Sequence, residues 1–468
     1  MAEDIQDTIR RRIEILLRRH QVPSLTVGLA QSGKPLYLES VGFADVPAGR
    51  PACPLTQYRL GSITKTFTAA LVLGLAERGV LDLDEPVEAF FPGTSVGLPG
   101  TSVGLPATNV GRARLRQLLA HTGGVQREAP LPMWSTMQGP DRDGLLQSLA
   151  RAESVGRPGS RWHYSNLGYA ILGEIVRRVT GTPGEDLISA HFLTPLGLTS
   201  TTWQPEPERA VGYRLDPYQR GVVYREPEMD QGAIGIGGQL WSTAEDLLGW
   251  GHALLGGAPE VVPATVATAM HTPQVMVDQD NWNQGWGLGL ILDRRGGRIL
   301  SGHTGGMPGF MSALAMDRRR QFVAVAFANV TRGIRLPDLC AELIDDALER
   351  YPDGSGPVLG VPVQGLPAEL IGVLGRWWSE SEETIFSWQH GGLHARLTEA
   401  PQIAATQIQV TSSPVMESSA TTFRREGPDR YRASSGRLCG ESLRIKRDER
   451  GDVVELEWAT YPYRRQPN

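Results

Sequence analysis

Hydrophobic residues change their spacing along the chain, and each change predicts a different kind of structure. Near the start, Ile5, Ile9, Ile13 and Leu17 recur every four residues with arginines on the other faces, which predicts an amphipathic helix. Such a helix can lie on a membrane surface, but packing against the body of the domain is the commoner arrangement. We therefore expect it to cover part of the core.

The next segments alternate between strand and helix patterns. The run SLTVGLAQSGKPLYLESVGFAD predicts two strands joined by a turn at Ser32-Gly33-Lys34. A helix is predicted from about Ser62 to Arg78, with Gly79 as its C-terminal cap. From about 85 to 250 the pattern is mostly helical, with Gly/Pro-rich loops. One loop repeats GTSVGLP at 93–99 and 100–106, which we interpret as a surface duplication.

Strand patterns return at about 286, in WGLGLILD, GRILSGHTGG, SALAMD and QFVAVAFANV, before a helix LPDLCAELIDDALERY. Strands at both ends with helices between them predict an α/β layer with a helical insertion. YPDGSGPVLGVPVQGLP then reads as a linker, and the short alternating strands beyond it predict a small all-β, barrel-like domain. The predicted boundaries are a main domain at 1–352, a linker at 353–367 and an accessory domain at 368–468.

Composition excludes several classes of protein. The formal net charge of −5 argues against nucleic acid as a partner, because phosphate binding needs a basic surface. Cys53, Cys340 and Cys439 are odd in number and contain no CxxC pair, which predicts free thiols and no metal site. The start has no secretory apolar core, and no run is long enough to span a bilayer. These features predict a cytoplasmic protein without a membrane partner.

Lysine use singles out one segment. Among 46 basic residues only Lys34, Lys65 and Lys446 are lysines, and all the others are arginine. A lysine can lose its proton when it is desolvated, whereas an arginine cannot, so a retained lysine needs a reason. Lys34 lies in a predicted turn and Lys446 in a charged strand, which suits ordinary surface residues. Lys65 follows Ser62 by one helical turn in Gly61-Ser62-Ile63-Thr64-Lys65.

The Ser62–Lys65 spacing suits nucleophilic catalysis. Residues three apart share a helical face, and a neutral lysine can accept a serine's proton. Burial and the helix N-terminus would both lower the pKa of Lys65, and free N–H groups there can hold an oxyanion. The alternative is that Ser62 caps the helix and Lys65 is solvated. The scarcity of lysine in this chain favours the catalytic interpretation.

Two further motifs follow in order. Tyr164-Ser165-Asn166 is the chain's only Tyr-x-Asn, and His303-Thr304-Gly305 lies in a strand pattern. With Ser62-x-x-Lys65, this order resembles the serine β-lactamase and penicillin-binding-protein superfamily, in its class C β-lactamase-like branch, over about residues 5–350. The resemblance implies an antiparallel sheet flanked by helices with a helical subdomain.

HTGG occurs twice, at 121–124 and at 303–306, and the resemblance assigns only the second copy to the site. The second copy lies between strand patterns, as expected for an edge strand beside a cleft. The first follows the helical run RARLRQLLA, so we expect Gly123 and Gly124 to end that helix in a structural turn.

The roles implied by the resemblance are those of an acyl-enzyme mechanism without metal or cofactor. Ser62 attacks a carbonyl carbon, while Lys65 and Tyr164 move protons, Tyr164 acting as a phenolate or as a relay. Asn166 orients Lys65 and binds the substrate amide. The N–H groups of Ser62 and Gly306 form the oxyanion hole.

Substrate contacts are expected from the third motif. His303 and Thr304 would meet a substrate carboxylate or other acceptor, and Gly305 would let the substrate approach the strand. Most β-lactamases and cell-wall peptidases of the superfamily have lysine where His303 stands. Histidine carries a full charge only below about pH 6.5 unless shifted, which favours the D-aminopeptidase and esterase relatives.

The expected function is therefore hydrolysis of small esters, amides or D-amino-acid-containing substrates, with weak β-lactam hydrolysis. The sequence does not separate ester from amide. A true β-lactamase or D-alanyl-D-alanine carboxypeptidase is the alternative within enzymes, and a non-catalytic ligand sensor the alternative outside them. The accessory domain either stabilises a homodimer or caps the fold, or it narrows the cleft.

Overall fold

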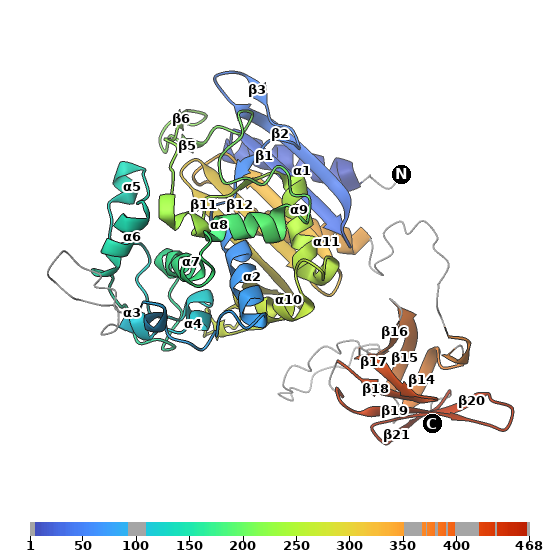
Figure 1. Ribbon diagram of the computed structural model, residues 1–468. Helices are drawn as coiled ribbons and strands as arrows, with labels where there is room; N and C mark the ends of the chain where they lie inside the picture. The colour runs from blue at the N-terminus through green and yellow to red at the C-terminus, as the bar shows by residue number, and fades with distance from the viewer. Residues whose placement is uncertain are drawn as a thin grey trace. The chain divides into compact units, whose positions relative to one another are not determined.

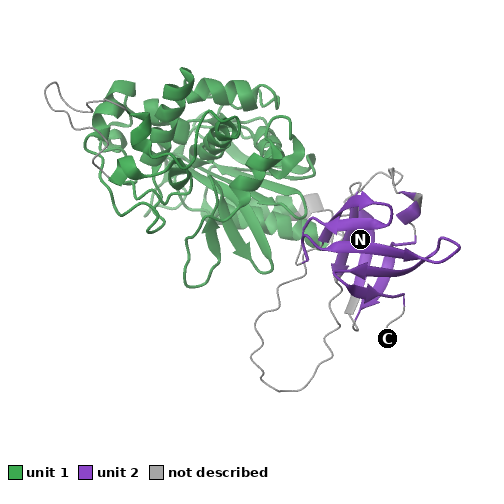
Figure 2. Ribbon diagram, turned by 60° about the horizontal axis from the view of Figure 1, so that its bottom comes forward, with its two compact units in different colours: residues 1–355 green, residues 356–468 purple. Residues whose placement is uncertain are grey.

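The computed structural model describes residues 5–91, 109–350 and, nearer the C-terminus, 367–370, 372–379, 382–389, 392–397, 421–435 and 438–465. The chain divides into two compact units, residues 1–355 and 356–468 (Figure 2). The GTSVGLP repeat lies outside the described residues, as does the predicted linker apart from Pro367.

The first unit is built on an antiparallel sheet flanked by helices (Figure 1). Nine strands are described, in the spatial order β3 (Arg50–Pro51), β2 (Lys34–Asp45), β1 (Ser24–Gln31), β13 (Phe322–Ala328), β12 (Phe310–Asp317), β11 (Arg298–Met307), β10 (Ile291–Arg295), β9 (Gln284–Trp286) and β8 (Val275–Met276). Strands from both ends of the sequence meet where β1 pairs with β13. The predicted α/β layer is thus confirmed.

Both faces of this sheet are buried. In β13, Val325 packs with the hydrophobic cluster of α2 (Thr64–Glu77) and α9 (Ala244–His252). Its neighbour Ala326 faces the other way, into the cluster with α1 (Ile5–His20) and α11 (Leu336–Arg350). Ile9 and Ile13 are fully buried in that second cluster. The N-terminal helix therefore packs against the domain, as its hydrophobic stripe predicts.

Helix α2 follows directly from a short 3₁₀ turn, η1 (Gly61–Ile63), which carries Ser62. The helix ends as predicted, because Gly79 adopts φ +72° and its N–H bonds to Ala76 while Val80 N–H bonds to Leu75. That pair of bonds is a Schellman cap. Nearly every residue of α2 is buried, so the helix is held rigidly between the sheet and the helical part.

Figure 1 shows α3 to α7 gathered beside the sheet. The regular elements described between 85 and 250 are mainly helices, as predicted, but they cover less than half of that region, and short strands β5 to β7 were not foreseen. Its elements, with neighbouring short ones, are β4 (Tyr58–Arg59), η2 (Val87–Phe90), α3 (Asn109–Arg112), α4 (Leu115–Leu119), α5 (Met133–Thr136), α6 (Arg142–Leu149), α7 (Asn166–Thr180), α8 (Gly184–Ile188), η4 (Ser189–Leu193), β5 (Tyr213–Leu215), β6 (Val223–Arg225), η5 (Gly232–Gly237), β7 (Trp241–Ser242), η6 (Ala253–Gly257) and α10 (Ala264–His271).

The second unit is an antiparallel meander that nearly closes into a barrel. Backbone hydrogen bonds between Trp378 and Arg464 join its first strand to its end. After η7 (Ala368–Leu370), its described strands are β14 (Gly375–Ser379), β15 (Glu382–Gln389), β16 (Gly392–Leu397), β17 (Thr421–Gly427), β18 (Arg430–Ala433), β19 (Ser442–Arg447), β20 (Val453–Trp458) and β21 (Tyr461–Tyr463). Trp377, Phe386 and Leu456 fill its core. The predicted all-β, barrel-like fold is confirmed.

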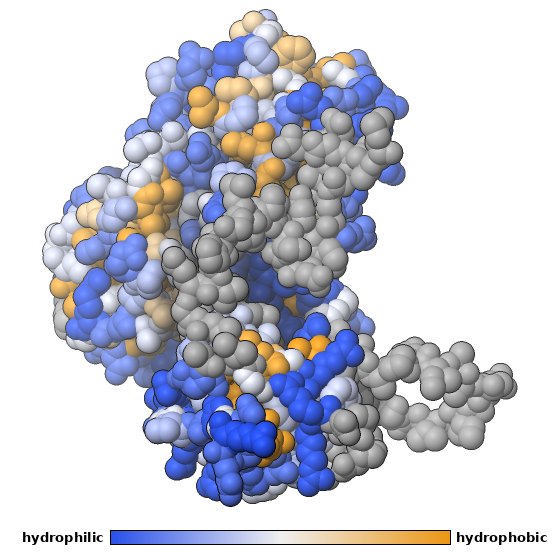
Figure 3. All heavy atoms as spheres, turned by 90° about the vertical axis from the view of Figure 1, so that its right-hand side faces the viewer, coloured by the Kyte–Doolittle hydropathy of each residue, from blue (hydrophilic) through white to orange (hydrophobic). Residues whose placement is uncertain are grey.

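Surface features agree with the composition. In the view of Figure 3 the described surface is mostly hydrophilic, and hydrophobic residues appear in small separate patches. Within the described ranges, no helix combines the length and apolarity needed to cross a bilayer. The cysteines Cys53, Cys340 and Cys439 are all free thiols, as predicted.

Candidate active site

Ser62 and Lys65 are brought together at the start of α2. Lys65 Nζ lies 3.1 Å from Ser62 Oγ and donates a hydrogen bond of 2.7 Å to the carbonyl oxygen of Gly237. The lysine side chain is 1% exposed, whereas Ser62 remains partly accessible. A buried amine thus sits within hydrogen-bond reach of an accessible hydroxyl, which is the arrangement that base-assisted nucleophilic attack requires.

Burial changes the protonation of Lys65. Desolvation lowers the pKa of its amine to about 7, and the charge of Arg127 adds to this effect, while the carboxylate of Glu128 opposes it. A large fraction of the amine is therefore neutral at physiological pH. A neutral amine can accept the proton of Ser62.

Tyr164 completes the group around Ser62. Its hydroxyl is hydrogen-bonded to Ser62, and Lys65 Nζ lies 5.2 Å from the centre of its ring. Burial raises the pKa of the Tyr164 phenol, and the bond to Ser62 offsets only part of that rise. Of the two roles considered for Tyr164, a neutral proton relay fits this environment and a standing phenolate does not.

Asn166 begins α7, which Ser165 caps by accepting a hydrogen bond from Gly168 N–H. The side chain of Asn166 donates to Glu128 Oε1 at 2.7 Å. Lys65 is instead oriented by Gly237. The expectation that Asn166 orients Lys65 therefore differs from the hydrogen bonds observed, and both Glu128 and Gly237 were missed from the sequence.

The turn before Ser62 packs directly against β11. A Cβ atom on Gly305 would lie 1.8 Å from Leu60 O, and one on Gly61, at φ +53°, would lie 2.9 Å from Gly306 N. Only glycines permit so close an approach of two backbones. Thus Ser62 and Gly306 are held at the same cavity, as an oxyanion hole would require.

That cavity is small, about 80 Å³. It is lined by Ser62, Arg127, Glu128, Met133, Trp134, Asn166, Gln231, Ile234, Gly237, Gly306 and Met307. Charged groups and apolar walls face the same space. Three of the expected site residues are among them, and Lys65 reaches the cavity through Ser62.

Strand β11 differs from the expected edge strand. It pairs with β12 on one side and with β10 on the other, but the pairing with β10 ends at Gly302. From His303 to Met307 the strand has a partner on one side only. Thr304 and Gly305 thus lie where an extended substrate could add to the sheet.

His303 is buried rather than exposed to the cavity, with 3% of its surface accessible. Its Nδ1 lies 2.7 Å from Thr304 O, and Trp286 packs edge-on at 5.5 Å. Burial and the neighbouring Lys65 lower the pKa of His303 to about 3. The imidazole is therefore neutral, so of the two expected partners, a carboxylate or another acceptor, the uncharged acceptor suits His303 better.

The first HTGG copy forms a turn as expected, but not through its glycines. Helix α4 ends at Leu119, and His121, at φ +56°, takes the left-handed position of a Schellman cap. The assignment of the helix end to Gly123 and Gly124 was wrong. The ring of His121 also packs 4.2 Å from that of Tyr164, so this copy supports the site from behind.

A buried arginine fixes the loop that holds Lys65. Arg59 is 3% exposed and donates to Met229 O and, at 2.6 Å, to Gln239 Oε1. These two residues bracket the loop whose Gly237 carbonyl accepts from Lys65. Arg59 thus helps to position the Gly237 carbonyl by holding both ends of its loop. No local sequence pattern predicts these contacts of Arg59.

We expect Arg59→Met to lower the free energy of unfolding by about 2–4 kcal/mol, because it removes the donor to the buried Met229 carbonyl and one of the two donors to Gln239 Oε1. Urea denaturation measures the loss. Arg214→Met, at an exposed arginine of β5, is the matched control and should change stability by less than about 0.5 kcal/mol. Equal losses of stability in the two variants would show that the hydrogen bonds of Arg59 do not hold this loop.

Known proteins resemble the chain in this same region. Esterase EstB of Burkholderia gladioli is 31% identical over 307 residues, which is 59% of this chain and 76% of that protein. A D-stereospecific amidohydrolase from Streptomyces sp. superposes with a TM-score of 0.58 at 27% identity, over 72% of this chain and 97% of that one. A class C β-lactamase from Rhodobacter sphaeroides, at 20% identity, shares the fold with a TM-score of 0.60 over 74% of this chain and all of that one.

Family profiles match both units. Residues 366–465 match a domain of unknown function (DUF7586). Residues 6–349, which contain Ser62, Lys65, Tyr164 and the strand from His303, match the Beta-lactamase family. The chain therefore belongs to the Beta-lactamase family and is a serine hydrolase of that family.

Proposed function

We propose that the protein hydrolyses small esters or amides through an acyl-enzyme on Ser62. The observation that carries this proposal is the 3.1 Å approach of a buried Lys65 amine, with a pKa of about 7, to Ser62 Oγ. The solvated-lysine alternative needs an exposed ammonium, and Lys65 is not exposed.

Acylation begins when Ser62 Oγ attacks the carbonyl carbon and passes its proton to the neutral Lys65 amine. The carbonyl oxygen becomes an oxyanion, held by the N–H groups of Ser62 and Gly306. As the tetrahedral adduct collapses, the neutral Tyr164 hydroxyl protonates the departing alcohol or amine and recovers a proton from Lys65. The products of this half-reaction are an ester on Ser62 and the released leaving group.

Deacylation repeats the same proton path with water. Lys65, neutral again, accepts a proton from a water molecule through Tyr164 as the water oxygen attacks the acyl carbon. The bond to Ser62 Oγ then breaks, and the oxygen regains its proton from the lysine. The acid leaves, and the hydroxyl and amine return to their starting states.

The substrate would lie between Asn166 and the open side of β11. Asn166 lines the cavity and is positioned by Glu128 to meet a substrate carbonyl or amide. Thr304 and Gly305 offer strand-like contacts, and His303 supports them as a neutral, buried group. Because His303 brings no cation, this site favours esters and amides over carboxylate-bearing β-lactams or D-alanyl-D-alanine peptides.

The proposal also covers the division of the chain. We assign catalysis to 1–352, with 353–367 as linker and 368–468 as an accessory domain that stabilises a homodimer or caps the fold, or else narrows the cleft. Free thiols in both units suit a cytoplasmic protein. A sensor without catalysis is disfavoured, because all four of Ser62, Lys65, Tyr164 and Asn166 are present around one cavity.

A substrate panel tests the proposal. Short-chain p-nitrophenyl esters, D-alanyl p-nitroanilide and nitrocefin should be compared by kcat/KM on the full chain. We expect the esters or the anilide to exceed nitrocefin by about a hundredfold or more, because the neutral His303 supplies no cation at the third motif. Preference for nitrocefin would favour a true β-lactamase, and no turnover at all would favour a sensor.

The carboxylate of Glu128 makes a finer prediction about amine-bearing substrates. Glu128 faces the Ser62 cavity, so a substrate ammonium group gains Coulomb attraction there. Glu128→Gln keeps an acceptor for Asn166 but removes the charge. We expect the ratio of kcat/KM for D-alanyl p-nitroanilide to that for the neutral N-acetyl-D-alanyl p-nitroanilide to fall about fivefold to tenfold. An unchanged ratio would show that Glu128 does not bind the amine.

A further inference from the structure

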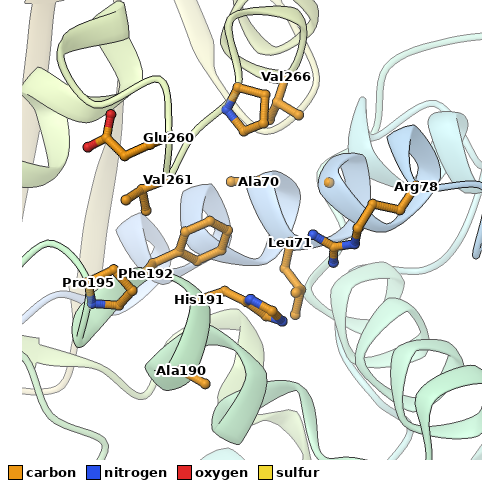
Figure 4. Close-up of a pocket in the computed structure, with 12 residues that line it drawn as sticks. Ala70, Leu71, Arg78, Ala190, His191, Phe192, Pro195, Glu260, Val261 and Val266 are labelled. Atoms are coloured by element: carbon orange, nitrogen blue, oxygen red, sulfur yellow. The ribbon is translucent and has the colours of Figure 1, made fainter.

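A second pocket lies against α2, away from Ser62. Ala70, Leu71 and Gly74 of α2 form one wall, and Phe192 of η4 and Val266 of α10 face them (Figure 4). We name it the α2 pocket. Its volume is about 250 Å³, which is room for roughly eight water-sized groups at ~30 Å³ each. It shares no lining residue with the Ser62 cavity.

The α2 pocket carries positive charge at one end. Figure 4 shows Arg78 and His191 beside Leu71, with Glu260 at the other end and its carboxylate turned away. In the described part of the chain, no carboxylate pairs with the Arg78 guanidinium. Burial and the charge of Arg78 lower the pKa of His191, so the imidazole is mainly neutral and Arg78 supplies the cation.

The surroundings mark the pocket as more than a gap between helices. His191 and Phe192 belong to η4, a π-helical turn, and such turns occur frequently at functional sites. Phe192 packs on Trp250, which stacks on Phe67 at 3.9 Å and donates to Thr66 Oγ1 at 2.8 Å. Thr66 and Phe67 directly follow Lys65 on α2. Phe192 in the pocket wall is therefore connected through Trp250 to the catalytic part of this helix.

We propose that the α2 pocket binds a small monocarboxylate with an apolar body, such as a short-chain aliphatic acid. The guanidinium fork of Arg78 is suited to a carboxylate, and the apolar walls suit an alkyl chain. Acids of this class are also what ester hydrolysis releases. The binding itself does not depend on the proposed hydrolysis.

Gly74 allows the pocket to be filled without disturbing the fold. A Cβ atom there would meet only Arg78 Nη1, at 3.9 Å, so a larger side chain extends into open space. Replacing a glycine in a helix interior also favours the helix by about 0.5–1 kcal/mol. Gly74→Leu should therefore melt no lower than the unmodified protein.

The test is calorimetric titration of hexanoate and of its neutral isostere hexanamide into the full-length Ser62→Ala variant, which excludes turnover. We expect hexanoate to bind, and Gly74→Leu and Arg78→Gln, each in that background, to weaken it about tenfold or more. Hexanamide should bind at least about tenfold more weakly than hexanoate. Arg177→Gln, at an exposed arginine in the last turn of α7, is the matched control and should bind like Ser62→Ala.

Three results would overturn the proposal. They are no hexanoate binding, equal binding of hexanamide, or affinities within twofold in Gly74→Leu and Arg78→Gln. None of these bears on hydrolysis, which the ester panel measures separately. A failure of the pocket is therefore distinguishable from a failure of the proposed enzyme function.

Discussion

Ser62→Ala is expected to lower turnover of the best ester substrate by about 10³-fold to 10⁶-fold and to abolish labelling by a fluorescent fluorophosphonate. Ser62 supplies the oxygen that becomes acylated, and neither Lys65 nor Tyr164 can replace it. The melting temperature should change little, because Ser62 is partly exposed and its side chain bonds only to catalytic groups. Labelling is measured by in-gel fluorescence and by intact-mass analysis.

The matched control is Ser154→Ala, at an exposed serine that does not line the Ser62 cavity. It should label and turn over like the unmodified protein. If Ser62→Ala is labelled as strongly as the unmodified protein, the nucleophile is another residue and the proposed mechanism is wrong. If it unfolds, its melting curve will show so, and Ser62→Gly then repeats the test.

Helical spacing explains why the centre of the site could be predicted. Ser62 and Lys65 are three residues apart, and the contact follows from helix geometry alone once the segment is helical. The scarcity of lysine in this chain then points to Lys65. Tyr164 and Asn166 could be added only through the resemblance to a family, because nothing local says that they face Ser62.

The groups that position Lys65 are less predictable from the sequence, because they belong to loops far away along the chain. Gly237 is 172 positions from Lys65, and Arg59 is 180 from Gln239. A backbone carbonyl has no sequence signature, so no residue pattern identifies Gly237 as a partner. Such long-range contacts depend on the whole fold.

The two HTGG copies show a second limit. The same four letters give a strand in one place and a helix cap in the other, because the flanking segments differ. The flanking segments correctly predicted a strand for the second copy and a turn after a helix for the first. It could not show that His121 and His303 both pack on Tyr164, at 4.2 and 6.3 Å between ring centres, or that burial keeps both neutral.

Lys65→Arg is expected to lower kcat/KM by about 10²-fold to 10⁴-fold, nearly as much as Lys65→Ala, although it keeps the positive charge. An arginine does not give up its proton in a protein, so it cannot accept that of Ser62. In the unmodified enzyme, kcat/KM should rise with pH through about 7, as Lys65 becomes neutral. The residual activity of Lys65→Arg should lack that rise. An arginine variant with a large share of the activity would make Lys65 an electrostatic element only.

A stability measurement on Lys65→Met checks the same burial independently of turnover. Unfolded Lys65 holds its proton up to about pH 10.5, whereas the folded amine releases it above about pH 7. The unfolded state therefore binds more protons between these values, and stability rises with pH across that window. Below pH 7 the full cost of burying the charge remains. Lys65→Met removes this cost, so it should melt higher than the unmodified protein at pH 6, with a gap that narrows toward pH 10. A gap that does not depend on pH would mean that the pKa of Lys65 is not depressed, and Lys65 could not then serve as the base.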